Sequence, residues 1–147
     1  MNADEVIEAL QLRPHAAEGG HFTEVWRDEH STAIYYFLAA GEVSAMHRLD
    51  AAELWHFYAG APVQMLLLRS DSTIGSPTLG ADLAAGQRPC VAIPAGTWMG
   101  GEPLGTWSLI GATVAPPYHD GRFELADRAD LLARYPDATE RITRLTP

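Results

Sequence analysis

The sequence predicts an all-β fold, an antiparallel sandwich or barrel, with short helices near the N- and C-terminal ends. About seven or eight short segments rich in β-branched and aromatic residues follow one another with turn residues between them, rather than alternating with helices. The length of 147 residues is that of one ordinary domain. No repeat, linker or low-complexity tract divides the chain, so we expect a single domain and a single core over residues 1–147.

A helix is expected at the start of the chain. Asn2 followed by Glu5 has the form of an N-terminal capping box, and Pro14 ends the helix near Leu12. The next segment, residues 15–21, contains two adjacent glycines and is therefore expected to form a turn. Three side chains on this turn are candidates for the border of a pocket: His15, Glu18 and His21.

Strands are expected from residue 21 onward. Residues 21–27 alternate in character, which places Phe22, Glu24 and Trp26 on one side. Residues 32–38 are largely β-branched or aromatic and predict a central strand that is buried on both faces. Further strands are expected at residues 63–68, 90–93 and 107–115, with a loop-rich interval at residues 70–86.

The C-terminal region is expected to be helical. Asp127 and Asp130 flank a helix start, and Pro136 stops that helix. Its apolar face comprises Leu131, Leu132 and Tyr135. A last helical turn is expected within residues 137–144.

The stretch 41–60 packs two histidines, the carboxylate of Glu53 and three aromatic residues into what is expected to be a short β-hairpin. A histidine near a carboxylate is held in one tautomer and made more basic, so His47 with Glu53 forms a candidate general base. The same two residues would equally suit a structural ion pair. The opposing catalytic acid would be Tyr58 or Tyr35.

Several further side chains are candidates for substrate binding. Arg27 or Arg48 would hold a carboxylate or phosphate through two hydrogen bonds. Trp55 and His56 lie on the same stretch as His47, and Trp98 follows a Pro-Ala-Gly turn where it would form a pocket wall. Large aromatic residues suit stacking on a ligand ring as well as a core.

Strand alternation separates the candidates on residues 53–58. Glu53 and Trp55 share one face of a regular strand, while His56 and Tyr58 share the other. His56 would therefore join Glu53 only if a bulge intervened.

The spacing within residues 41–60 resembles the first signature of the cupin superfamily, in which a glycine leads to two histidines, a glutamate and a closing glycine. The corresponding positions here are Gly41, His47, Leu49, Glu53 and Gly60. Leu49 therefore stands where the second histidine would be.

A second cupin signature is also incomplete. Gly86 leads to the turn Pro94-Ala95-Gly96, but Met99 stands at the position of the fourth metal ligand, and Pro103 replaces an asparagine.

More specifically, six segments in order resemble the cupin-5 family, small uncharacterised cupins grouped as domain of unknown function 985. The segments are PHAAEGGHFTEVWR, STAIYYFL, the stretch from HR to HFYAG, GQRP, PAGTW and GATVAP. The resemblance implies a double-stranded β-helix, a jelly-roll barrel around a small-molecule cavity, assembled as a homodimer by exchange of N-terminal strands. It does not imply a known reaction, although folds of this family have been likened to sugar epimerases.

The resemblance also bears on cofactors. A cupin metal ion, typically Fe, Mn, Ni or Zn, is held by three histidines and a glutamate. Only His47 and Glu53 remain of that set, so they are the two candidates for a divalent metal, and no cofactor is expected.

The composition of the chain restricts the classes of partner and the location that we expect. The formal charge of −9 and the scattered arginines argue against nucleic acid, and the absence of lysine excludes a Schiff-base or P-loop lysine. No segment is apolar and long enough for a membrane span, and the N-terminus lacks the pattern of a secretory signal. The lone Cys90 agrees with a reducing compartment, so a cytoplasmic location is expected.

These observations favour a small-molecule-binding cupin, with three open alternatives for its activity. The first is an isomerase or epimerase that acts on a sugar-like or nucleotide-linked substrate by acid-base chemistry. The second is a ligand-binding cupin without catalysis. The third is a metal-dependent oxygenase.

Overall fold

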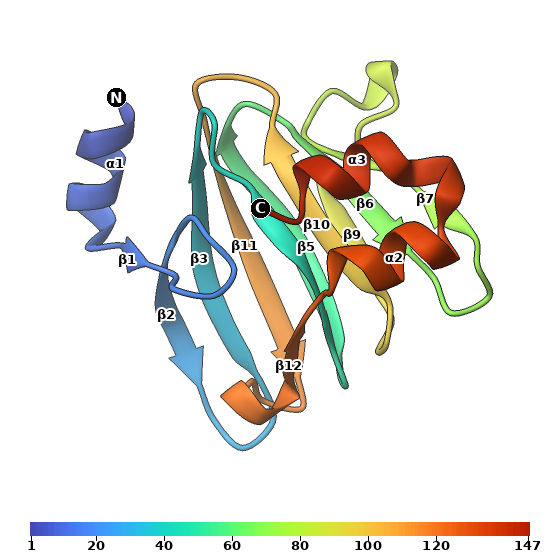
Figure 1. Cartoon of the computed structure of the whole chain (residues 1–147). Coiled ribbons are helices and arrows are strands. Elements are labelled where there is room, and N and C mark those ends of the chain that lie inside the picture. The colour runs from blue at the N-terminus through green and yellow to red at the C-terminus, as the bar shows by residue number, and fades with distance from the viewer.

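Two antiparallel sheets packed face to face form the protein, as shown by a computed structural model that describes all residues 1–147 (Figure 1). Sheet A contains, in spatial order, β1 (Arg13–Pro14), β2 (His21–Arg27), β3 (Thr32–Ala39), β11 (Trp107–Ala115), β5 (Ala52–Gly60) and β9 (Cys90–Ile93). Sheet B contains β12 (Phe123–Leu125), β4 (Ser44–Leu49), β10 (Trp98–Pro103), β6 (Val63–Leu68) and β7 (Ile74–Gly75), and β8 (Thr78–Leu79) also pairs with β6. The antiparallel all-β arrangement predicted from the sequence is confirmed.

The predicted central strand lies at the middle of sheet A. β3 pairs with β2 on one side and β11 on the other, and Phe37 and Leu38 on its two faces are fully buried. Residues that alternate between two buried faces have no polar side, which explains the apolar run in this strand. The main core lies between the sheets and includes Leu38, Leu67 and Ile110.

The stretch 41–60 is not a hairpin, contrary to the expectation from the sequence. β4 pairs with β10 and β12 in sheet B, whereas β5 pairs with β11 and β9 in sheet A. The chain crosses from one sheet to the other at Asp50 and the buried Ala51. His47 and Glu53, six residues apart in the sequence, therefore lie on opposite sheets.

The structure contains a strand that the sequence pattern did not predict. β10 lies between β4 and β6 although it contains two glycines and ends in Pro103. A Cβ atom on Gly100 would lie 2.7 Å from the carbonyl oxygen of Ser44, so the close approach of β4 requires glycine there. Because glycine and proline are uncommon in strands, an argument from residue propensity misses this one.

The alternation expected in residues 21–27 is interrupted. The register with β3 shifts between Glu24 and Trp26, so that Val25 forms a bulge. Phe22, Glu24 and Arg27 face the space between the sheets, while Trp26 lies on the surface, 57% exposed. The expectation that Trp26 shares a face with Glu24 was wrong.

Helices cover the outer face of each sheet. α1 (Ala3–Leu10) has the expected capping box from Asn2 and Glu5, and it packs with Val6 against Phe37 on the outer face of sheet A. It ends at Leu10, because Gln11 adopts a left-handed conformation. Two short 3-10 helices, η1 (Leu83–Ala85) and η2 (Asp120–Arg122), lie in connections.

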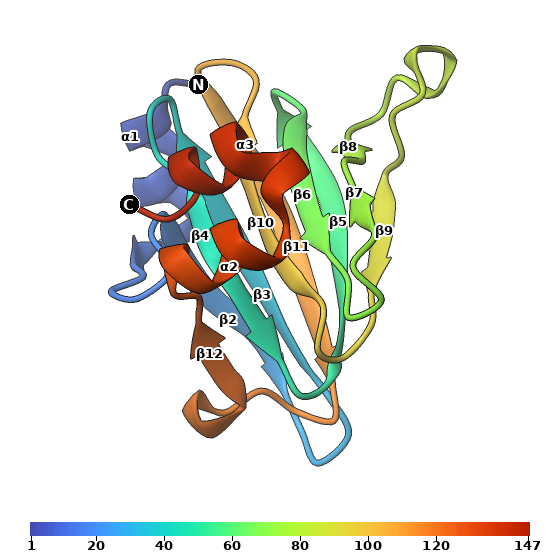
Figure 2. The same cartoon turned by 45° about the vertical axis from the view of Figure 1, so that its right-hand side comes forward.

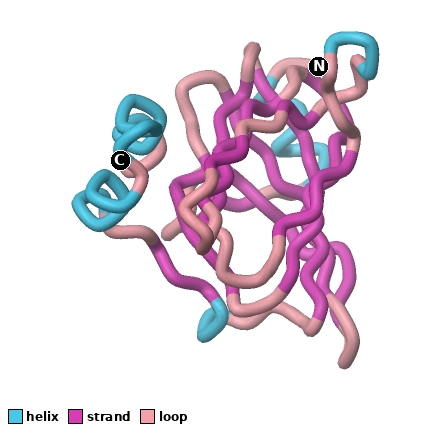
Figure 3. The backbone as a smooth tube through the Cα atoms, turned by 90° about the vertical axis from the view of Figure 1, so that its right-hand side faces the viewer, coloured by secondary structure: helices cyan, strands magenta, loops and turns pink.

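The C-terminal helices confirm the expected capping by Asp127 and cover the outer face of sheet B (Figures 2 and 3). They are α2 (Arg128–Arg134), η3 (Pro136–Ala138) and α3 (Thr139–Arg144). None of the helices in the chain has the length and apolar character needed to cross a membrane.

Candidate functional site

A cavity of about 340 Å³ lies between the two sheets. Both sheets supply its lining: β4 contributes His47 and Leu49, and β5 contributes Glu53 and Trp55. The turn that follows β1 adds Glu18. A concave, largely apolar site with a few converging polar groups is typical of small-molecule binding.

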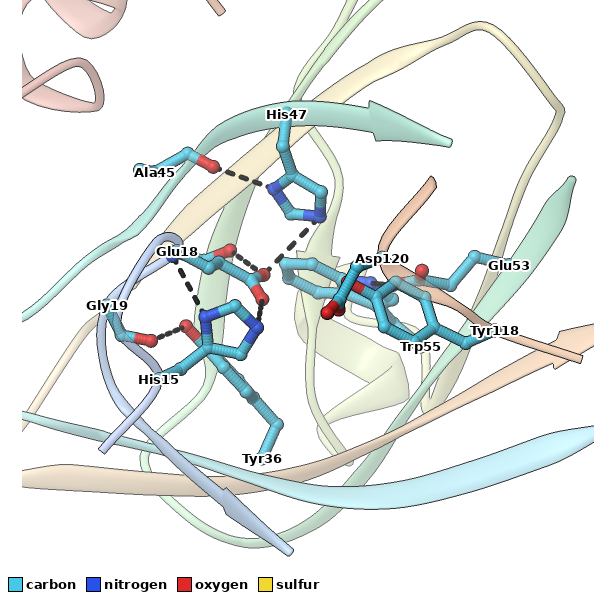
Figure 4. Close-up of polar contacts among 11 residues, drawn as sticks. His15, Glu18, Gly19, Tyr36, Ala45, His47, Glu53, Trp55, Tyr118 and Asp120 are labelled. Atoms are coloured by element: carbon cyan, nitrogen blue, oxygen red, sulfur yellow. Dashed lines mark hydrogen bonds and ion pairs between the residues drawn. The ribbon is translucent and has the colours of Figure 1, made fainter. Parts of the chain in front are cut away.

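His47 is held as a neutral base. The residue is 2% exposed, and Nδ1 lies 2.7 Å from the carbonyl oxygen of Ala45. Because a carbonyl oxygen only accepts hydrogen bonds, Nδ1 carries the hydrogen and Nε2 keeps its lone pair. Nε2 faces Glu18 Oε1 at 3.4 Å (Figure 4). Burial lowers the pKa of His47, which favours the neutral ring at neutral pH.

The ring plane of His47 is also fixed. The ring of Phe123 stacks on it, with centroids 5.1 Å apart and planes inclined by 18°. With one nitrogen bonded and one face covered, the imidazole has little freedom to turn. Its orientation is therefore set before any ligand arrives.

Glu18 reaches the cavity from the turn of residues 15–20. Gly19 and Gly20 have positive φ values of 93° and 69°, and a Cβ on Gly20 would lie 2.6 Å from the carbonyl oxygen of Phe37. The hydroxyl of Tyr36 donates to the carbonyl of Gly19, which ties the turn to β3. The glycines therefore permit the close approach that buries Glu18.

Several contacts hold the Glu18 carboxyl group. Ser44 donates its hydroxyl hydrogen to Glu18 Oε1 at 2.6 Å, and the backbone N–H of Glu18 donates to His15 Nδ1 at 2.9 Å. His15 Nε2 therefore carries the ring hydrogen and lies 3.7 Å from Glu18 Oε2. Burial raises the pKa of Glu18 from 4.5 to about 7, a rise that the Ser44 hydrogen bond and His15 oppose.

Glu53 enters from the opposite sheet. Its side chain is 7% exposed and accepts a hydrogen bond from the indole N–H of Trp55. Burial raises the pKa of Glu53 to about 7, the positive charge of protonated His47 would lower it, and Glu18 raises it further. Near neutral pH the cavity thus holds a neutral base beside carboxyl groups that can carry or release a proton, which acid-base catalysis requires.

The mouth of the cavity carries charged groups that are mostly paired. Arg27 donates to both carboxylate oxygens of Glu24 at 2.9 Å and to the carbonyl oxygen of Tyr118 at 2.9 Å. Arg13 lies over the ring of Phe22, 5.0 Å from its centroid. Burial and the nearby Asp120 raise the pKa of Tyr118 to about 12, so its hydroxyl stays protonated.

Three of the predicted site residues lie outside the cavity on the outer face of sheet A. Tyr35 and Tyr58 contact each other edge to face at 5.9 Å, and His56 stacks on Tyr58. His56 Nε2 lies 3.0 Å from Thr113 Oγ1. Strand alternation turns these side chains away from Glu53, so the expectation that Tyr58 or Tyr35 faces His47 is corrected.

Two more predicted residues lie on the outer face of sheet B. Trp98 is 9% exposed and packs beneath the C-terminal helices, so it does not form a pocket wall. The guanidinium carbon of Arg48 lies 4.3 Å from the centroid of a Trp98 ring, and Arg48 pairs with Glu124 at 2.7 Å. The turn before Trp98 was correctly recognised, but the helices that cover this face were not considered.

The donor set does not fit the metal ion that the cupin signatures imply. Leu49 and Met99, at the positions of two ligands, are buried in the apolar core, and Met99 is the neighbour of His47 on β10. No three His, Cys, Asp or Glu side chains are arranged to hold an ion. His47 and Glu53 alone would leave most coordination positions without a protein ligand.

The sequence argument left Glu18 out of the site proper, together with Tyr36 and Tyr118. It did identify the turn of residues 15–21 as a possible pocket border, and the structure places His15 and Glu18 in the lining. His21 does not line the cavity. The signal that could have found Glu18 is an acidic residue directly before two adjacent glycines, where a turn presses a side chain inward.

Comparisons with known proteins agree with this fold. The sequence profile of a family described as Cupin superfamily (DUF985) matches residues 4–126. The solved structure of protein SO0799 from Shewanella oneidensis is 35% identical, with a TM-score of 0.93 over 100% of this chain and 98% of that one. A hypothetical protein from Leishmania major is 26% identical, with a TM-score of 0.91 over 99% of each chain.

A more distant structure shows the same fold. A dTDP sugar isomerase from Desulfovibrio desulfuricans is 21% identical, with a TM-score of 0.58 over 79% of this chain and 80% of that one. The comparison with curated proteins finds no match. Together these likenesses confirm the predicted jelly-roll architecture.

Proposed function

The chain belongs to the cupin superfamily, in the family DUF985, and from that premise we propose that it binds a small carbonyl compound in the cavity and isomerises or epimerises it by proton transfer. One observation carries the proposal. The unprotonated Nε2 of His47 and the carboxyl groups of Glu18 and Glu53 converge in one buried cavity, with Glu18 Oε1 3.4 Å from Nε2. Perturbed titratable groups that cluster in a cavity are more typical of catalysis than of structure.

The proposed chemistry uses only side chains of this chain. His47 Nε2 takes a proton from the carbon next to the substrate carbonyl, and the C–H electron pair forms a C=C bond. The carbonyl oxygen meanwhile takes the proton of the Glu53 carboxyl group, which gives a neutral enediol. His47 then returns its proton to the other carbon while Glu53 recovers one from the adjacent hydroxyl, which gives the isomer without an external oxidant or reductant.

Glu18 acts on His47 rather than on the substrate in this scheme. As His47 takes a proton, Glu18 Oε1, which lies 3.4 Å from Nε2, can accept a hydrogen bond from the new N–H group. Ser44 keeps the carboxyl oxygen in place through its 2.6 Å hydrogen bond. Glu18 is therefore a positioning residue.

The test is exchange of the carbon-bound hydrogen for deuterium. The protein is incubated in D₂O with small aldoses and ketoses, and NMR follows loss of the signal next to the carbonyl. We expect exchange with the unaltered chain and its loss in His47→Asn. His56→Asn, which changes a histidine on the outer face of sheet A, is the matched control and should keep the exchange rate. Undiminished exchange in a folded His47→Asn variant would refute the proposal.

Ligand binding without catalysis is the second candidate. It is favoured by the hydrogen bonds that already satisfy the site, from Ser44 to Glu18 and from Trp55 to Glu53. A compound that raises the melting temperature but shows no exchange would support this candidate. The metal-dependent oxygenase is not carried forward, since Leu49 and Met99 replace its ligands.

We further propose that the chain forms homodimers. It carries a formal charge of −9, yet the side chains that β3, β5 and β11 present on the outer face of sheet A are uncharged. Tyr58 is 51% exposed and Leu54 37% exposed on this face, so contact there would bury apolar surface without repulsion. Light scattering should report a dimer for the unaltered chain and a monomer for Tyr58→Glu. A dimer that persists in Tyr58→Glu would place the interface elsewhere.

A cytoplasmic location and the absence of nucleic-acid partners remain proposals. The exposed free thiol of Cys90 and the acidic surface support them. Fractionation of cells and binding assays with DNA or RNA would test each directly.

A further inference from the structure

The lining of the cavity contains more acidic than basic side chains. Four carboxyl groups line it: Glu18, Glu24, Glu53 and Asp120. Two arginines, Arg13 and Arg27, are the only permanent cations among the lining residues, and the chain has no lysine. Anions are bound in proteins mainly by arginine and lysine, so the composition of this wall is unusual for a phosphate-binding site.

Both arginines are exposed, so neither guanidinium group lies in the buried part of the cavity. Three nitrogen atoms of the Arg27 guanidinium group already donate hydrogen bonds, two to Glu24 and one to the carbonyl oxygen of Tyr118. Arg13 is exposed and lies over Phe22 near the mouth, on a two-residue edge strand. A phosphate in the buried part of the cavity would therefore lie beside Glu18 and Glu53 rather than beside a guanidinium group, which is unfavourable in a buried site.

The deeper part of the cavity suits hydroxyl and carbonyl groups instead. Glu18, His47 and Glu53 are each at most 9% exposed and together offer hydrogen-bond donors and acceptors. Apolar walls from Phe22, Trp55 and Ile110 surround them. Carbohydrates combine apolar C–H faces with hydroxyl groups, and they match a lining of this kind.

Size agrees with this reading. The volume of about 340 Å³ lies at the lower end of the roughly 300–1,000 Å³ that small-molecule sites span. A monosaccharide fits within such a volume.

We propose that the substrate of this site is an uncharged, monosaccharide-sized aldose or ketose, and that the cavity rejects phosphorylated and nucleotide-linked sugars. This inference rests on the proposed function for the reacting groups, but it concerns the charge of the ligand and is tested by binding alone. The sequence had left sugar-like and nucleotide-linked substrates equally open.

The test is a matched panel of probes at one concentration. Glucose, fructose, their 6-phosphates, glucosamine and dTDP-glucose are compared by thermal shift, and positive results are measured by calorimetry. We expect at least one free hexose to bind about tenfold or more tightly than its 6-phosphate, because one charge-assisted contact changes affinity by about that factor. Free hexoses that fail to bind would overturn the inference.

A charge variant sharpens the test. Glu24→Gln removes the negative partner of Arg27 and leaves its guanidinium charge available at the cavity wall. This variant should raise the affinity for a hexose 6-phosphate relative to that for the free hexose by about tenfold. Glu29→Gln, at an 86% exposed side chain in the turn before β3, is the matched control and should change neither affinity.

The outcomes separate this inference from the proposed function. Tighter binding of a phosphorylated or nucleotide-linked sugar would overturn the inference, even if that sugar exchanged its hydrogen in D₂O. Tighter binding of protonated glucosamine than of glucose would overturn it as well, since the site would then select cations. Selective binding of a free hexose without exchange would support the inference and refute the proposed catalysis.

Discussion

The two faces of sheet B differ in what fills them. On the outer face, Met46 and Leu66 pack against Leu131 and Ile142 of the C-terminal helices, each of them at most 3% exposed. On the inner face, the next residue along β4, His47, borders a cavity that also contains buried carboxyl groups. One strand therefore supplies an apolar core on one side and titratable groups on the other.

The two faces differ in the free-energy cost of the groups that they bury. Buried ionisable groups destabilise a fold unless they are paired, so packed apolar side chains would be the more stable filling. The outer face follows that rule throughout, whereas the inner face, which also carries the core residues Leu67 and Met99, departs from it at His47. Residues that depart from the rule at a cavity are the ones that we assign to function.

The largest expected effect tests neighbouring positions on β4. His47→Asn should lower the exchange rate about 10²–10⁴-fold, because it removes the general base. Met46→Leu, one residue away on the outer face, should leave the rate unchanged and cost less than about 1.5 kcal/mol of stability. NMR exchange rates and denaturant unfolding of both variants check this pair. Equal losses of activity would show that the two faces do not divide the roles.

Stability should depend on the outer face. Ile142 in α3 is fully buried, so Ile142→Ala should lower the free energy of unfolding by about 2–5 kcal/mol. The rate per folded molecule should not change. Urea unfolding measures the loss, and Leu83→Ala, at a 61% exposed site in η1, should cost far less. An effect of Ile142→Ala below that of Leu83→Ala would contradict the packing described for this face.

The buried carboxyl group of Glu18, which lines the cavity, should make the stability of the fold depend on pH. Unfolded Glu18 loses its proton near pH 4.5, while the folded side chain keeps it up to about pH 7. The folded state therefore binds more protons between these values, and its stability falls as pH rises, by on the order of 3 kcal/mol above pH 7. Glu18→Gln removes this loss, so its melting temperature should exceed that of the unaltered chain at pH 8.

At pH 5 the two proteins should differ little, since Glu18 is then protonated in the folded state. Glu29→Gln serves as the exposed control, with no such pH-dependent gain. Melting curves at both pH values provide the measurement. A variant that is less stable at pH 8 would mean that Glu18 is stabilised in its ionised form.

The smallest effect is expected at the edge of the outer face. Arg48 is partly exposed, lies over Trp98 and pairs with Glu124. Arg48→Gln should cost about 1 kcal/mol or less, because exposed ion pairs and cation–π contacts contribute little. The cost should shrink further in high salt. A loss of ligand binding in this variant would bring Arg48 back into the site.

Much of the fold was predictable because its signals are local. The capping residues Asn2 and Asp127, the central strand at residues 32–39 and the turn at Gly96 each follow from a few neighbouring side chains. Strand alternation alone puts Glu53 and Trp55 on one face, although it does not say which way that face points. The cupin resemblance then supplied the jelly-roll architecture.

The remaining features depend on contacts between distant segments. Glu18 meets Ser44 only because the turn of residues 15–20 folds against β4, a contact across 26 positions. Trp98 is covered by helices from the other end of the chain. The bulge at Val25, which turns Arg27 inward, leaves no mark in a regular alternating pattern.

The corner at Asp50 and Ala51 has a consequence for how such a site adapts. Since His47 and Glu53 stand on separate sheets, the thickness of the side-chain layer between the sheets determines the gap that a ligand must bridge. Substitutions at neutral wall positions, for example Ile34 or Ala112, would widen or narrow that gap while both reacting groups stay in place. Substrate range in this architecture is thus adjustable through hydrocarbon bulk alone.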